Sequence, residues 1–171
     1  VTILTAKPSL FDGFERPITI AALPDMIGAP VPTPGLFAQA TPEVMHCVPL
    51  GVAKTRATMR TIIDHLDDID PALFVVDVSA EIALLARIAS VPAISIRMHG
   101  DRLDPGHLGA YQASVGLLAP FGEALEQGDT PDWVRAKTCY AGGLCTTVDP
   151  VPTKAEADPL AVRMGGRPAS A

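Results

Sequence analysis

Side chains that could take part in chemistry gather in two short segments of the chain, each at the end of an apolar run. Asp77 and Glu81 lie at and just after the end of the run 73–78. The second segment follows the run 93–97 and contributes two guanidinium groups, an imidazole and a carboxylate, on Arg97, His99, Asp101 and Arg102. Paired guanidinium donors hold phosphate or carboxylate oxygens, and an imidazole that titrates near neutrality serves as a base. These two segments form the candidate site.

The same side chains also have structural interpretations. A carboxylate at a strand-to-helix turn, such as Asp77, commonly accepts hydrogen bonds from a nearby hydroxyl or from backbone amides. A glutamate in the first turn of a helix, such as Glu81, complements the helix dipole. Asp101 and Arg102 could form an ion pair on a solvated loop. The sequence favours structural roles for Asp77 and Glu81 and leaves both roles open for the second segment.

Strand and helix signals alternate along the chain and determine how these segments are placed. Apolar and β-branched runs predict strands, and apolar stripes at helical spacing predict helices. The predicted strands are residues 1–5, 18–23, 73–78, 93–97, 115–119 and 138–141, and the predicted helices are residues 50–69, 79–89 and 105–114. This alternation predicts an α/β, Rossmann-like layered domain with a mainly parallel sheet and helices on both faces. The run 73–78 is almost continuously apolar, so we expect its strand to be covered on both faces.

Ligands of such sheets bind beyond the carboxyl ends of the strands. The turns after residues 73–78 and 93–97 leave the sheet at that edge, so we expect the two polar segments to lie side by side. The predicted substrate-binding residues are Asp77, Glu81, Arg97, His99, Asp101 and Arg102. The catalytic residue stays unassigned, with Asp77 and His99 as candidates.

Composition excludes several classes of protein. The chain has 171 residues, a formal net charge of −6 and an aromatic content of 5%, so nucleic acid is not an expected partner. The apolar fraction of 48% is too high for a chain disordered throughout. The most apolar stretch, residues 72–96, includes three charged side chains. Each would cost about 2.5–3.5 kcal/mol in hydrocarbon, so no transmembrane segment is predicted.

Cysteine and histidine spacing predicts neither a disulfide framework nor a metal site. The three cysteines are widely spaced and odd in number, which is typical of reduced cytosolic proteins. No close cluster of thiolates and imidazoles suits zinc. We expect His46 and His65 to be structural, and His107, at a predicted helix start, to face solvent or to cap the helix.

Several short motifs, taken in order, resemble a family of bacterial GT-B glycosyltransferases related to the enzyme that adds N-acetylglucosamine to the peptidoglycan lipid precursor. The motifs are Asp-Val-Ser-Ala-Glu at 77–81, Arg-Met-His-Gly-Asp-Arg at 97–102, Asp-Pro-Gly-His at 104–107, Leu-Leu-Ala-Pro at 117–120 and Tyr-Ala-Gly-Gly at 140–143. The resemblance extends over residues 1–144. It implies the N-terminal, acceptor-binding half of a two-domain enzyme whose C-terminal domain binds a nucleotide-sugar.

The resemblance also implies the reaction and its setting. The complete enzyme would move a sugar from the nucleotide-sugar to a hydroxyl of a small-molecule or lipid-linked acceptor, with no cofactor and no essential metal. It would be cytoplasmic, at most peripheral to the inner face of the membrane. The family's first strand and glycine-rich loop would precede Val1, and the donor-binding domain would follow Gly143, so the chain alone is expected to be inactive.

The division into domains follows from the same resemblance. Residues 1–147 are interpreted as an incomplete, Rossmann-like acceptor-binding domain, and residues 148–171, rich in proline and glycine, as a linker or disordered tail. Two other functions stay open. One is a part of a sugar-nucleotide epimerase, which shares the two-domain architecture, and the other is a non-catalytic α/β domain that binds a small molecule.

Overall fold

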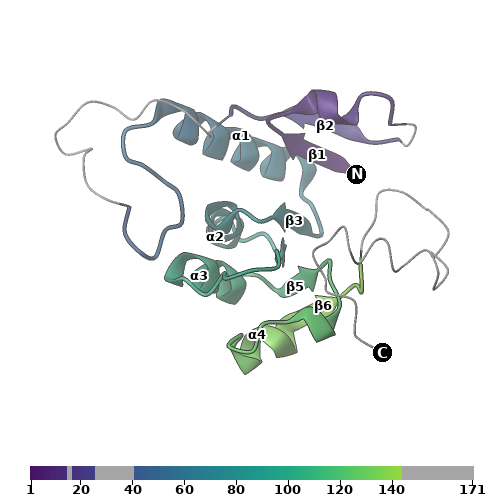
Figure 1. Cartoon of the computed structure of the whole chain (residues 1–171). Helices are drawn as coiled ribbons and strands as arrows, with labels where there is room; N and C mark the ends of the chain where they lie inside the picture. Colours follow the sequence, from purple (N-terminus) through teal and green to yellow (C-terminus); the bar gives the residue numbers. More distant parts are fainter. Residues whose placement is uncertain (15–16, 26–40, 144–171) are drawn as a thin grey trace.

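The computed structural model describes residues 1–14, 17–25 and 41–143 (Figure 1). The α-helices are α1 (Ala53–Ile69), α2 (Ala80–Ile88), α3 (Pro105–Ala113) and α4 (Asp132–Lys137). The strands are β1 (Thr2–Thr5), β2 (Thr19–Ala22), β3 (Phe74–Asp77), β4 (Ala93–Ile96), β5 (Gly116–Ala119) and β6 (Thr138–Tyr140). Two short 3-10 helices are η1 (Pro8–Phe11) and η3 (Glu123–Leu125). The segment 148–171, interpreted above as a linker or tail, lies outside the described residues.

The strands form two parallel sheets. β1 pairs with β2 in one sheet, and the other sheet has the order β3-β4-β5-β6. All of these pairs are parallel, with Val76 opposite Ser95 and Ser95 opposite Leu117. The α/β, Rossmann-like layered architecture expected from the alternation of strands and helices is thereby confirmed.

Local sequence signals account for the helix ends. α1 ends where Asp70 adopts a left-handed conformation, with φ of 44°, just before Pro71; a proline there cannot continue the helix. The Ser79 hydroxyl caps α2 by accepting a hydrogen bond from the Ile82 amide at 3.4 Å. Asp104 caps α3, whose first residue is a proline, as is common at helix starts. The capped starts of α2 and α3, which follow β3 and β4, hold the polar turns at the carboxyl edge of the sheet.

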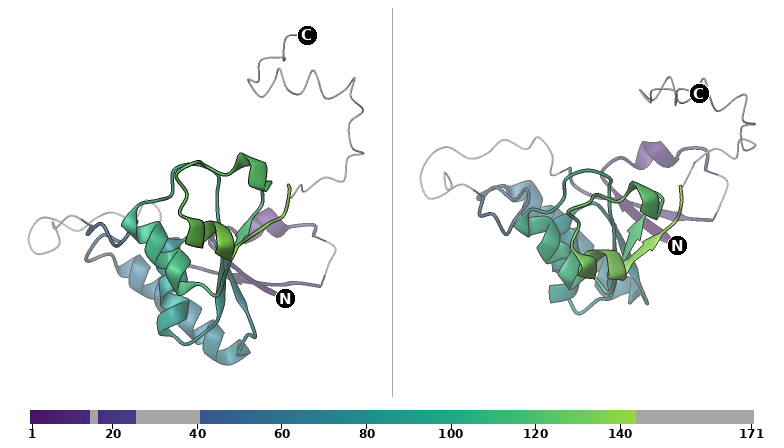
Figure 2. Two further views of the ribbon diagram at one scale, coloured as in Figure 1. Left: turned by 90° about the horizontal axis from the view of Figure 1, so that it is seen from below. Right: turned by 60° about the horizontal axis from the view of Figure 1, so that its bottom comes forward.

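Small side chains bring the helices close to the four-stranded sheet. Alanines of α2, α3 and β4 form one buried cluster with Val76. A second cluster joins Tyr111 of α3, Leu117 of β5 and Val134 of α4. Paired residues of neighbouring strands share a face, so these contacts place α2, α3 and α4 on the same face of the sheet. Figures 1 and 2 show α1 continuing this layer beside α2.

The four α-helices that the described residues form therefore cover one face of the sheet. The expected α-helices on the second face are not found in the described part of the chain. Ile94 and Ile96, which point to the opposite face of β4, are only half-buried. The expectation that β3 is covered on both faces is wrong, because Val75 at its centre is 51% exposed. Among the described residues, β3 stands at the end of its sheet, with a strand neighbour on one side only.

Candidate functional site

Arg97, predicted to bind substrate oxygens, is instead buried in a network inside the domain. Arg97 is only 4% exposed. Two guanidinium nitrogens donate to the two carboxylate oxygens of Glu126, at 2.7 and 3.1 Å. Nη1 also donates to the Thr138 hydroxyl at 2.9 Å, and the guanidinium lies over the Tyr111 ring, 5.6 Å from its centroid. All these partners belong to the chain itself, so Arg97 joins the end of β4 to the segment before α4 and to β6.

Glu126 is the acceptor at the centre of this network. Besides Arg97, the Tyr140 hydroxyl donates to it at 2.6 Å and the Thr130 hydroxyl at 2.8 Å. Burial by itself would raise the pKa of the Glu126 carboxyl. The hydrogen bonds from Arg97, Tyr140 and Thr130 outweigh this effect and lower the pKa to about 2. The carboxylate is therefore ionised at neutral pH and fully engaged with partners within the domain.

The other residues of the second predicted segment lie on the loop between β4 and α3. The His99 Nε2 atom lies 3.0 Å from the Leu125 carbonyl, and its ring meets Phe121 edge-on at 5.6 Å. Asp101 is exposed and accepts a hydrogen bond from the Leu103 amide. Arg102 is half-buried, and its Nε has no hydrogen-bond partner among the described residues. The His99 side chain is exposed, and its Nε2 atom is already engaged by the Leu125 carbonyl.

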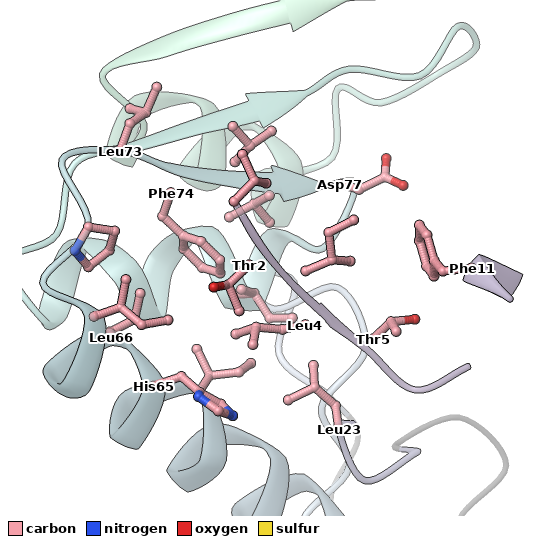
Figure 3. Close-up of a pocket in the computed structure, with 18 residues that line it drawn as sticks. Thr2, Leu4, Thr5, Phe11, Leu23, His65, Leu66, Leu73, Phe74 and Asp77 are labelled. Carbon is pink, nitrogen blue, oxygen red and sulfur yellow. The ribbon is translucent and has the colours of Figure 1, made fainter. Parts of the chain in front are cut away.

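Asp77 and Glu81 do not face the same space. Asp77 is exposed at the end of β3 and lines a cavity between β1 and β3 (Figure 3). Glu81, in the first turn of α2, accepts a hydrogen bond from the Cys47 amide at 2.5 Å. Glu81 thus anchors the loop that contains His46 and Cys47 at the N-terminus of α2, a role that neither of its sequence interpretations included.

A second group of side chains meets where that loop crosses the start of α3. We call His46, Asp104 and His107 the histidine–aspartate cluster. The Asp104 carboxylate accepts two hydrogen bonds from His107, one from the backbone amide at 3.2 Å and one from Nδ1 at 2.5 Å. The His46 ring stands edge-on to the His107 ring, with centroids 4.4 Å apart. The cluster lies at the carboxyl edge of the sheet, the edge where ligands bind in this class of fold.

The geometry of His107 corrects one sequence expectation and supports another. The prediction of a solvent-facing His107 is wrong, because the residue is 2% exposed. The alternative prediction, that His107 caps the helix, is nearer to the structure, because His107 hydrogen-bonds to Asp104, the residue that caps α3. Partial burial raises the pKa of Asp104, but the hydrogen bonds from His107 outweigh it and hold that pKa below its usual value. The ionised carboxylate fixes a proton on Nδ1 of His107.

Nε2 of His107 is the chemically open atom of the cluster. It is buried, and no described residue hydrogen-bonds to it. With Nδ1 protonated toward Asp104, Nε2 of the neutral ring carries a lone pair. Such an atom accepts a proton or a hydrogen bond, or coordinates a metal ion. Because His46 is exposed and lies against the His107 ring, a shift of its loop would open the cluster to a ligand.

A glycine on α3 allows the His46 loop to approach this closely. A Cβ atom added to Gly106 would lie 3.0 Å from the His46 backbone nitrogen and 3.2 Å from the Met45 carbonyl carbon. These distances are shorter than ordinary contacts, so a side chain at position 106 would push the loop away. Gly106 therefore sets the position of His46 over His107.

The cluster also offers a set of metal ligands that spacing along the chain did not predict. His46, Asp104 and His107 each offer one ligand atom, and these atoms lie within 4.8 Å of one another. Two imidazoles and a carboxylate suit zinc or a similar divalent ion. The contact between Asp104 and Nδ1 of His107 is a hydrogen bond, so these two atoms already satisfy each other. His46, expected from the sequence to be structural, is thus one of three side chains that could hold a metal ion.

The signals that could have identified the cluster were present but ambiguous. Asp-Pro-Gly-His at 104–107 reads as a helix start, and a capping aspartate three residues before a histidine places both on one turn. Nothing near His46 in the sequence points to this turn, because the contact spans a long stretch of chain. Only the fold brings the three residues together.

Fold and site together define this chain as a parallel α/β domain with a polar cluster at the carboxyl edge of its larger sheet. Comparisons with protein-family models, with curated protein sequences and with solved structures found no match to it. Among the described residues, no helix is both long enough and apolar enough to cross a membrane.

Proposed function

We propose that this chain is the acceptor-binding part of a glycosyltransferase, which moves a sugar from a nucleotide-sugar donor to an acceptor hydroxyl. The observation that carries this proposal is the buried His107, paired with Asp104 and with a free Nε2 at the ligand-binding edge of the sheet. The donor would be held by a second domain facing this edge, as the family resemblance implies.

The arrangement suits the proton transfer that such a reaction needs. The acceptor hydroxyl would lose its proton to Nε2 of His107 as its oxygen bonds to the anomeric carbon of the donor sugar, and the nucleoside diphosphate would leave with the electrons of the broken bond. Asp104 would stabilise the imidazolium that forms. The exposed His46 ring would turn off the His107 ring and contact the acceptor as it enters, and Glu81 would retain its hold on the loop through Cys47.

A non-catalytic α/β domain that binds a small molecule is the second candidate. It is favoured by the burial of Nε2 and by the commitment of Arg97 to internal partners, since both reduce the number of groups that can reach a substrate. The epimerase alternative has no feature of its own in this site.

Histidine-ring NMR signals of the full chain test the proposal. N-acetylglucosamine, glucose and glucose 1-phosphate serve as probes for an acceptor that carries hydroxyls with or without phosphate. We expect the ring signals of His46 and His107 to shift on titration, whereas those of His65 stay unchanged. His107→Gln and His46→Gln should weaken binding by about tenfold or more, and His65→Gln should not.

Two variants, one at the exposed His46 and one at the buried His107, separate an effect on binding from an effect on folding. His46 is exposed, so His46→Gln should leave the thermal midpoint close to that of the parent chain even if His107→Gln lowers it. Probes that shift neither histidine, or that bind equally well to both variants, would contradict the proposed site. Binding at the cluster with no sugar transfer in the presence of a donor domain would favour the non-catalytic candidate.

A further inference from the structure

The histidine–aspartate cluster has the chemistry of a site for a divalent transition-metal ion. Its residues, His46, Asp104 and His107, each offer one ligand atom, and these atoms lie within 4.8 Å of one another. Imidazole nitrogen is a preferred ligand of zinc and of the neighbouring transition metals, whereas Ca²⁺ and Mg²⁺ take oxygen ligands. Two imidazoles with a single carboxylate therefore favour zinc or a similar ion over calcium or magnesium.

The hydrogen bonds of Asp104 decide which atoms remain for an ion. Its Oδ1 accepts from the His107 amide at 3.2 Å, and its Oδ2 accepts from Nδ1 of His107 at 2.5 Å. Both carboxylate oxygens are thus engaged, and the proton on Nδ1 leaves the lone pair of the neutral His107 ring on Nε2. A histidine that ligates a metal commonly donates its other ring N–H to a carboxylate, which orients the ring. Asp104 has the place of that orienting carboxylate.

Burial distinguishes Nε2 of His107 as an atom that needs a partner. His107 is 2% exposed, and no described residue hydrogen-bonds to its Nε2. A buried polar atom without a partner is unfavourable. Of the two rings that contact the His107 ring, His46 is the nearer, with centroids 4.4 Å apart against 6.3 Å for Tyr111. His46 is therefore the side chain placed to supply a second ligand to an ion on Nε2.

The loop that carries His46 is held close to α3 by its backbone, while the His46 ring reaches solvent. The Cys47 amide donates to the Glu81 carboxylate at 2.5 Å, and a Cβ added to Gly106 would lie 3.0 Å from the His46 backbone nitrogen. The ligand atoms of a tetrahedral zinc ion lie about 3.3 Å apart, against at most 4.8 Å in the cluster. Rotation of the exposed His46 side chain closes this difference and leaves the loop backbone in place.

The charges around the cluster favour a cation despite its place at a helix start. Asp104 caps the N-terminus of α3, where the helix dipole amounts to roughly half a positive elementary charge. The ionised Asp104 carboxylate carries a full negative charge at the same point. Glu81, which holds the His46 loop, adds a second carboxylate beside the cluster. The carboxylates therefore outweigh the dipole.

We propose that His46 and Nε2 of His107 bind one divalent transition-metal ion, zinc or a close chemical relative, with Asp104 as the carboxylate that orients His107. Water would complete the coordination. The ion would fasten the His46 loop to the start of α3 and would withdraw Nε2 from any other ligand. This inference stands on the geometry of the cluster and does not depend on the proposed glycosyltransferase function.

Titration of the complete 171-residue chain with zinc chloride tests the proposal. The chain is first freed of metal with EDTA, transferred to buffer without chelator and kept reduced with a phosphine. We expect one zinc ion per chain, bound in the micromolar range. The thermal midpoint should rise by roughly 5 °C or more at a zinc concentration about a hundred times Kd. Zinc should shift the Nε2 signal of His107 in histidine-ring NMR spectra, and Mg²⁺ should have neither effect.

Substitutions at the cluster locate the ion. His46→Gln removes a ligand at an exposed position, so it should keep the fold that a substitution of the buried His107 could disrupt, and it should weaken zinc binding by about tenfold or more. Cys47→Ser, at the next residue, and His65→Gln, on α1, are the matched controls and should leave the affinity unchanged.

Asp104→Asn tests the orienting role separately. The asparagine can still cap α3, but it no longer accepts strongly from Nδ1 of His107. We expect zinc affinity to fall by about tenfold and the tautomer balance of the His107 ring to change in the spectra of the metal-free chain. An unchanged tautomer balance together with unchanged zinc affinity would refute the role given to Asp104.

Three outcomes would overturn the metal site. The first is no zinc binding up to millimolar concentration, or equal affinity in the parent and His46→Gln chains. The second is a loss in Cys47→Ser as large as that in His46→Gln, which would place the ion on the thiolate. The third is equal affinity for Zn²⁺ and Mg²⁺, which would show unselective attraction to carboxylates. A chain that binds zinc as described, but in which no sugar probe shifts either histidine, would support the metal site and contradict only the proposed acceptor site.

Discussion

At the scale of single residues, Arg97 and Glu126 exchange two charge-assisted hydrogen bonds where neither side chain reaches water. Their side chains are 5% and 3% exposed. A bidentate pair of this kind orients both groups strongly. The Thr130 and Tyr140 hydroxyls also donate to Glu126, and the Thr138 hydroxyl accepts a further hydrogen bond from Arg97. The pair therefore belongs to the stability of the domain, and a substrate would have to displace Glu126 to reach Arg97.

We expect Arg97→Ala to destabilise the fold by about 3 kcal/mol, because removing one partner leaves a buried carboxylate without its counter-charge. The sequence analysis assigns Arg97 to substrate binding instead and does not predict this structural role. Urea unfolding at neutral pH measures the change in the free energy of unfolding. Arg87→Ala, on an exposed position of α2, is the matched control and should cost less than about 1 kcal/mol. Equal losses for the two variants would contradict the network described here.

Glu126 should make stability depend on pH in the acid range. Its pKa is about 2 in the folded chain against an ordinary value of 4.5, since the hydrogen bonds from Arg97, Tyr140 and Thr130 outweigh the effect of burial. A depressed folded-state pKa contributes stability that is complete above the unfolded pKa and disappears as the pH falls. The loss should occur between about pH 5 and pH 2 and amount to roughly 3 kcal/mol.

Urea unfolding of the parent chain and of Glu126→Gln across this range checks that expectation. The variant should be less stable at neutral pH and should show a shallower fall toward acid pH, because it has no carboxyl at this position. Asp104, whose pKa is also lowered, adds a residual slope of the same sign in both chains. Identical slopes in parent and variant would show that Glu126 does not titrate as described.

At the scale of elements, α3 and the loop before α1 are fitted to each other through glycine. A Cβ added to Gly106 would lie only 3.0 Å from the His46 backbone nitrogen, whereas a Cβ added to Gly109, one turn further along the same helix, would meet no atom within 4 Å. The pair therefore separates the intrinsic helix preference for alanine from the contact that positions the histidine–aspartate cluster.

We expect the two substitutions to differ. Gly109→Ala should stabilise the chain by roughly 0.5–1 kcal/mol, since glycine is unfavourable inside helices. Gly106→Ala should destabilise it or cancel that gain, and it should shift the His46 ring signals as the loop moves off His107. Thermal unfolding and histidine-ring NMR measure both effects. A gain at position 106 with unmoved His46 signals would mean that the loop is not held by this contact.

The α2 and α3 starts share one further property at this scale. Each is capped by a side chain of its own turn, Ser79 or Asp104, and each also receives the loop that carries His46 and Cys47. The loop thus joins two helix N-termini at the carboxyl edge of the sheet. Glu81, a residue of the predicted site, therefore holds this loop by accepting a hydrogen bond from the Cys47 amide.

At the scale of the whole molecule, the proposed function places only the acceptor side of the reaction on this chain. Transfer requires donor and acceptor to be held together in a defined geometry. We therefore expect the purified chain to transfer no sugar from UDP-N-acetylglucosamine to N-acetylglucosamine or glucose, although it binds the acceptor probes. Release of UDP, measured by a coupled assay, checks this. Turnover above that of an Asp104→Ala, His107→Gln double variant would refute the proposed division between acceptor and donor domains.

Short-range pattern was enough to predict most of the fold. Short apolar runs became β3, β4 and β5, and longer segments before and between them became α1, α2 and α3; both kinds of signal are properties of consecutive residues. The parallel pairing of the three strands follows in turn, because a helix between two strands returns the chain to the same end of the sheet. Ser79 as the cap of α2 was predictable for the same local reason.

Tertiary structure alone decided the chemistry of the polar groups. Arg97 and His107 have sequence neighbours typical of solvated turns, yet both are buried, because segments far along the chain bring Glu126 to one and pair Asp104 and His46 with the other. Whether a polar side chain meets water, a partner or a ligand depends on which distant residues fill the space around it. That space is defined only when the helices and strands have packed, and no pattern of consecutive residues encodes it.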